Sequence, residues 1–129
     1  MSGEHVNDRP QRGPSTARLP LLLPGSLSDD QRTVYEAVTG GPRDTGRDAP
    51  FRLTDESGCL VGPFNAMLYS PSVGLPLQDL GAALRFRTAF TKREREIATL
   101  AVAAHLRSDF EWYAHERVGR LQDRVGGPL

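Results

Sequence analysis

The sequence predicts an all-α protein of one domain, and two observations carry this prediction. After a polar start, four stretches in succession combine residues typical of a helix N-terminus with apolar residues at helical spacing. One of these stretches is rich in alanine and apolar on nearly every side, which is typical of a buried helix. The chain has 129 residues, which is enough for one domain.

Composition excludes several classes of partner. Sixteen basic and sixteen acidic residues give a formal net charge of zero, so the chain has no cationic excess for binding nucleic acid. The single cysteine, Cys59, cannot form an internal disulfide, and no Cys/His spacing for a metal site occurs. The start of the chain lacks a basic region followed by an apolar stretch, and the apolar run at 19–23 is too short to span a bilayer. We therefore expect a cytoplasmic protein with no nucleic-acid or membrane partner.

The start of the chain differs in composition from the rest. Residues 1–17 are polar, contain prolines, and have almost no large apolar side chains. Such a segment cannot bury enough surface to offset the entropy lost on ordering. We expect a disordered leader over residues 1–17 and one folded domain over residues 18–129.

The first predicted helix begins after Ser28. Ser28 and Gln31 have the spacing of a capping box, in which each side chain bonds the backbone of the other, and two glycines at 40–41 provide the end. Val34 and Val38 then share one face, which we expect to be buried.

The middle of the chain predicts a turn and two further helices. Residues 55–58 have turn composition between two apolar pairs. Pro63 opens a short helix over residues 64–69, because proline is tolerated at the first helical position. Ser70 is the expected cap of a longer helix over residues 71–88. Its apolar residues at helical spacing are Val73, Leu77, Leu80 and Leu84.

The alanine-rich stretch gives the clearest helical pattern. Thr91 and Glu94 form a second capping box, and His105 and Arg107 lie where the helix dipole favours positive charge. Because residues 97–104 are apolar on nearly every side, we expect this helix to form the core.

The last predicted helix carries the residues best suited to chemistry. It begins after Ser108 and runs over residues 109–118 or slightly further. Glu111 and His115 lie one turn apart and share a face with small apolar residues, an arrangement that suits a partly enclosed proton-transfer site. Glu96, in the preceding helix, is a second carboxylate close to apolar surroundings.

Each of these residues also has a purely structural interpretation. Glu111 stands at capping-box spacing from Ser108, and Glu96 is near a helix start, where the dipole favours an acid. A lone histidine such as His115 is more often structural or solvated. Arg85 could bind a substrate carboxylate or lie on a solvated face.

The chain resembles the carboxymuconolactone decarboxylase family over about residues 18–120. The resemblance rests on two stretches, GPFNAMLYSP and LGAALRFRTAFTKREREIATLAVAAHLRSDFEWYAH. It implies an all-α, alkyl hydroperoxidase D-like helical bundle that assembles as a homo-oligomer, either a trimer or a hexamer.

The family includes peroxidases whose site has two cysteines followed by a histidine. Aligning that pattern on the histidine places His115 on it, Glu111 on the second cysteine and Ser108 on the first, and Glu96 falls on an acid that precedes them. Disulfide exchange needs a thiolate and a resolving thiol, and neither position has one. Peroxiredoxin-type activity is therefore not expected.

The resemblance that remains is to the decarboxylase branch, which acts in aromatic degradation. It implies a carbon–carbon lyase in which a γ-carboxymuconolactone or related small organic acid loses carbon dioxide and His115 delivers a proton. Glu111 and Glu96 would orient or tune the imidazole, while Ser108 and Arg85 would bind the substrate. No metal or organic cofactor is required.

One departure from the family leaves a second hypothesis open. Only 14 residues follow His115, so the later helices that complete the family's bundle have no counterpart here. The chain could instead be a catalytically inactive helical fragment or an oligomer subunit. Whether it is an enzyme stays open at this point.

Overall fold

The structure is a computed structural model that describes residues 19–43 and 51–125. Within these ranges the chain is all-α, as predicted, and its only β-type contact is an isolated bridge between Thr54 and Leu60. The expected disordered leader lies outside the described residues. A short 3₁₀ helix, η1, precedes five α-helices: η1 (Pro24–Ser26), α1 (Asp29–Thr39), α2 (Pro63–Leu68), α3 (Pro71–Phe86), α4 (Lys92–His105) and α5 (Asp109–Val125). No helix among the described residues is long and apolar enough to cross a membrane.

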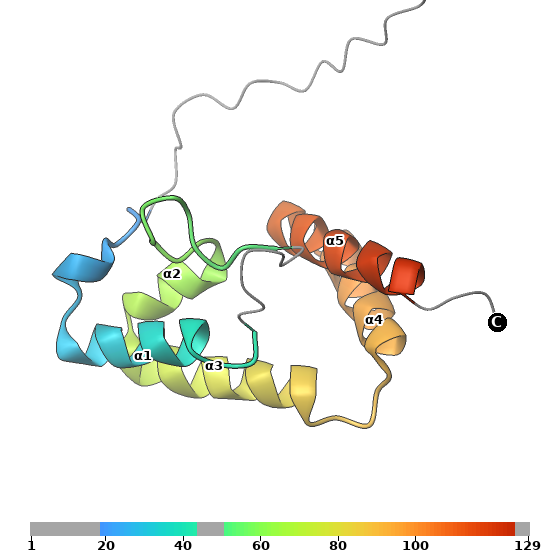
Figure 1. The fold of residues 1–129 in the computed structure, drawn as a ribbon, viewed down its shortest axis with the longest axis horizontal. Helices are drawn as coiled ribbons and strands as arrows, with labels where there is room; N and C mark the ends of the chain where they lie inside the picture. Colours follow the sequence, from blue (N-terminus) through green and yellow to red (C-terminus); the bar gives the residue numbers. More distant parts are fainter. Residues whose placement is uncertain (1–18, 44–50, 126–129) are drawn as a thin grey trace, which may run out of the picture.

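The helices form two groups (Figure 1). Helices α1, α2 and α3 pack together, and we call them the α1–α3 half. Helices α4 and α5 pack along each other as a hairpin, and residues 87–91 connect this α4–α5 hairpin to the end of α3. The segment before α2 starts beside α5 and then crosses to the α1–α3 half, so it joins the two groups.

The hydrophobic core lies in the α1–α3 half. Its fully or nearly fully buried residues come from the segments around α1, the turn and α2: Leu27, Val34, Val38, Leu60 and Leu68. Helix α4 is not this core, so the prediction that residues 97–104 are buried is wrong for the single chain. Ile97 and Val102 are each 58% exposed, and Ala103 is the buried apolar residue of α4. Apolar side chains all round a helix require cover, but α5 covers only one face.

Capping residues set the starts of α1 and α4 as predicted. Ser28 and Gln31 form both bonds of a capping box, and so do Thr91 and Glu94. Ser70, in contrast, makes no side-chain capping bond. Pro71 occupies the first helical position, where proline is tolerated, and the Ser70 carbonyl oxygen accepts from the backbone N–H groups of Val73 and Gly74.

Helix α3 packs through the side opposite its predicted apolar row. Its buried residues are Gly74 and Gln78. A Cβ atom at Gly74 would lie 2.3 Å from the Met67 carbonyl oxygen, so glycine is what allows α2 and α3 to approach this closely. The apolar row is about half exposed along its length and consists of Val73, Leu77, Leu80 and Leu84.

A glycine–phenylalanine contact joins the two groups of helices. Gly62 has φ +59°, a conformation that favours glycine, and a Cβ atom there would lie 2.2 Å from the Phe110 ring. Phe51 meets the same ring edge to face, with centroids 5.4 Å apart. Helix α5 therefore rests on the segment that leads into α2, and it runs to Val125, beyond the predicted end near 118.

Candidate functional site

A histidine held between two carboxylates is the centre of the candidate site. His115 Nδ1 lies 2.6 Å from Glu96 Oε2, and His115 Nε2 lies 3.4 Å from Glu111 Oε2. Packing of α4 against α5 brings Glu96 to the imidazole, whereas Glu111 reaches it from one turn earlier on α5. The two carboxylates take opposite nitrogens of one ring.

The three side chains become steadily more exposed from Glu96 through His115 to Glu111. Glu96 is 3% exposed, His115 17% and Glu111 38%. Glu96 thus supports the imidazole from inside the hairpin, while Glu111 and the Nε2 edge of the ring face outward. This order suits a residue that exchanges protons with a bound molecule through Nε2.

The surroundings of Glu96 favour its ionised form. Burial alone would raise its pKa, but the hydrogen bond from His115 and the charges of His115, Arg85 and Arg95 outweigh burial, so the pKa is lowered. An ionised carboxylate only accepts hydrogen bonds, so the proton on the Glu96 side belongs to Nδ1. Nε2 is then the ring nitrogen on the side of Glu111.

His115 and Glu111 line a cavity of about 1100 Å³ between the α1–α3 half and the α4–α5 hairpin. Five aromatic side chains form much of its apolar surface: Phe51, Phe64, Phe86, Phe90 and Phe110. Five cationic side chains also line it: Arg43, Arg85, Lys92, Arg93 and Arg95. Glu111 is the one carboxylate in the lining that the described residues contribute. The cavity therefore favours an organic anion with an apolar body.

Arg95 connects the end of α3 to the buried carboxylate. Its Nη1 donates to the Arg85 carbonyl oxygen at 2.6 Å, and its Nε lies 3.7 Å from Glu96 Oε1. The side chain is largely buried, at 18% exposed. It therefore holds a positive charge beside Glu96 and fixes the chain where α3 passes into α4.

The structure brings four of the five sequence-predicted residues together. His115 is hydrogen-bonded to Glu96 and lies at ion-pair distance from Glu111, and Arg85 lines the same cavity. Ser108 is not part of the lining. Its Oγ lies 3.5 Å from the Glu111 backbone N, two turns away from His115. Ser108 therefore caps the start of α5.

Sequence reasoning missed the residues that the α1–α3 half contributes to the cavity. Arg43 follows α1 in a glycine- and proline-rich connection, where no periodicity predicts its position. Phe64 lies on α2, and the sequence predicted only that it belongs to a short helix. A basic residue in such a connection is a weak signal, because most are solvated.

Neither a metal site nor a reactive cysteine is supported among the described residues. Among residues 19–43 and 51–125, no group of three potential ligands is arranged to hold a metal ion, and the two carboxylates on His115 point to different ring nitrogens. Cys59 is buried, and burial followed by the nearby Asp55 raises the pKa of its thiol, which disfavours the reactive thiolate. No protein-family model, curated protein or solved structure matches the chain.

Proposed function

We propose that this protein is an acid–base enzyme that needs no cofactor and decarboxylates a small organic acid or lactone, in the manner of the carboxymuconolactone decarboxylases. The observation that carries the proposal is the His115 imidazole, held between Glu96 and Glu111 at the edge of an arginine- and phenylalanine-lined cavity. The resemblance noted from the sequence supports the same reaction class and the same three residues.

In the proposed reaction, the bond between the substrate carboxyl carbon and its ring carbon breaks. Its electron pair moves into the unsaturated lactone, carbon dioxide leaves, and the conjugated system takes a proton at its far carbon from His115 Nε2. Glu96 holds the ring through Nδ1 and stabilises the imidazolium before transfer. Arg85, which lines the same cavity, adds positive charge that attracts the anionic substrate.

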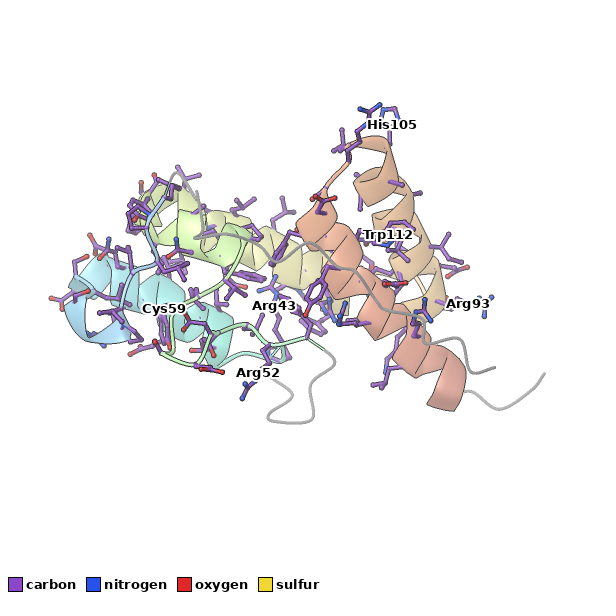
Figure 2. All side chains as sticks on the ribbon, turned by 90° about the horizontal axis from the view of Figure 1, so that it is seen from above. Arg43, Arg52, Cys59, Arg93, His105 and Trp112 are labelled. Atoms are coloured by element: carbon purple, nitrogen blue, oxygen red, sulfur yellow. The ribbon has the colours of Figure 1, made fainter. Side chains whose placement is uncertain are left out.

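Replacing His115 by alanine tests the proposal directly. We expect the rate of γ-carboxymuconolactone decarboxylation, measured as carbon dioxide released, to fall at least about 100-fold. General acid catalysis contributes an acceleration of this order. His105→Ala is the matched control, since His105 is exposed at the far end of α4 (Figure 2) and should leave turnover unchanged. Circular dichroism of both variants checks that the helices remain.

Exposed apolar surface favours a second candidate role, that of an assembly subunit. The row Val73, Leu77, Leu80 and Leu84 is accompanied by Ile97 and Val102 on α4, and all are at least 49% exposed. Monomeric proteins rarely leave so many large apolar side chains in water. We propose that a second copy of the chain covers them, as the trimer or hexamer implied by resemblance would. An inert subunit would associate yet show no turnover that depends on His115.

A further inference from the structure

We propose that Arg43 is the anion anchor of the cavity, and that it selects organic carboxylates by binding their charged group on the α1–α3 side, across from His115. This assignment deepens the proposed function and rests on the same cavity. Figure 2 shows Arg43 in the space between the α1–α3 half and α5.

The guanidinium of Arg43 is held in place by one buried glutamine. Nη1 donates to Gln78 Oε1, and Nη2 donates to the Gln78 carbonyl oxygen at 3.2 Å. Gln78 is only 5% exposed, and its own Nε2 donates to Asp79 Oδ1 at 3.3 Å, so its amide oxygen is directed at the arginine. An arginine fixed at two nitrogens loses little further freedom when it binds a ligand.

The surface around Arg43 is shaped to receive its guanidinium. The group lies 5.6 Å from the Phe64 ring centroid, which supports its flat face. A Cβ atom at Gly81 would lie 2.7 Å from Arg43 Nη2. The absence of a side chain at Gly81 therefore leaves the space that Arg43 occupies on α3.

Arg43 keeps donors that the described part of the protein does not use. A guanidinium carries five N–H donors, and the described residues accept from two of its nitrogens, both through Gln78. Within the described ranges, no carboxylate lies at ion-pair distance from it, and Asp79 acts on it only through its field. Burial, and after it the nearby charge of Arg85, lowers the pKa of the Arg43 guanidinium, so desolvation and a neighbouring cation both disfavour its charged form. A bound carboxylate would offset both effects and satisfy the remaining donors.

The test compares binding of benzoate and benzamide to the full chain by titration calorimetry. The two probes share a flat ring for the phenylalanine-lined cavity and differ in charge. We expect the unmodified protein to bind benzoate at least about 10-fold more tightly than benzamide, as a charge-assisted, two-donor contact implies. Arg43→Gln should remove this preference by weakening benzoate about 10-fold while leaving benzamide unchanged.

Two further variants separate the role of Arg43 from an effect on folding. Gly81→Ala should also weaken benzoate, because the new methyl group displaces the guanidinium, although alanine favours the α3 helix. Gly25→Ala is its control, because a Cβ atom there meets nothing within 4 Å. Arg52→Gln is the control for charge, since Arg52 is exposed and points away from the cavity in Figure 2.

Three outcomes would overturn the assignment. In the first, the unmodified protein binds benzoate no more tightly than benzamide. In the second, the preference for benzoate survives Arg43→Gln. In the third, Arg85→Gln abolishes the preference whereas Arg43→Gln does not. The His115→Ala variant keeps this inference distinct from the proposed enzyme activity, because it should retain the benzoate preference. A benzoate preference that depends on Arg43, without any turnover, would contradict the enzyme proposal only. Turnover that depends on His115, without a benzoate preference that depends on Arg43, would contradict the anchor only.

Discussion

At the scale of single residues, Glu96 sets the geometry of the site because it is the buried partner of His115. Its pKa is lower in the folded chain than its ordinary value of 4.5, so its ionised form stabilises the fold. This stabilisation is fully present above the unfolded value and is lost as pH falls through the lower folded value. The groups that face Glu96 are His115, Arg85 and Arg95.

We therefore expect Glu96→Gln to lower the free energy of unfolding by about 1–3 kcal/mol at pH 7, with a smaller difference as pH falls below about 4.5. Urea denaturation at pH 7, 5 and 4 measures it. The control is Glu116→Gln, whose ion pair with Arg120 is exposed to solvent and should contribute almost nothing at any pH. An equal difference between wild type and Glu96→Gln at pH 7 and pH 4 would contradict the linkage.

How far the site could be predicted depends on how local each contact is. Glu111 and His115 are one helical turn apart, so spacing alone placed them on one face. Glu96 meets His115 only because α4 and α5 pack in one register, and the resemblance was needed to suggest it. Arg43 reaches the cavity through a tertiary contact with Gln78, which no local pattern encodes.

At the scale of helices, the start of α4 depends on a side-chain cap, whereas the start of α3 does not. Thr91 Oγ1 accepts from the Glu94 backbone N, while Ser70 makes no capping bond. Thr91→Ala should cost about 1 kcal/mol of stability, and Ser70→Ala should cost almost nothing. Thermal or urea unfolding of the two variants measures this contrast. Equal losses would show that helix starts here do not depend on the side-chain bond.

Helix positions were predictable to a greater degree than helix environments. Capping boxes, Pro63 and the glycines after α1 act on the backbone nearby, so the sequence indicates where helices begin and end. Burial depends instead on which other surface arrives. Residues 97–104 therefore looked like a core, although only one side of α4 is covered in the single chain.

At the scale of the whole molecule, the exposed apolar row on α3 predicts self-association. One chain has a mass of 14.1 kDa, and light scattering after size exclusion should give a multiple of this value at micromolar concentration. Leu80→Lys should reduce the mass toward one chain, because Leu80 is 55% exposed and its replacement would bury a charge at the interface. Ser72→Lys, an exposed position on the same helix, is the control. Identical masses for wild type and Leu80→Lys would place any interface elsewhere.

The residues proposed for proton transfer and those proposed for binding belong to parts of the chain that are separate in sequence. Glu96, Glu111 and His115 all belong to the α4–α5 hairpin, while Arg43 and Phe64 belong to the α1–α3 half, and Gly62 against Phe110 is where the two meet. Mutations can therefore change these two groups of residues independently. Under the proposed function, substitutions in the first two-thirds of the chain would alter which molecule the cavity accepts and would leave the proposed proton-transfer residues of the hairpin unchanged.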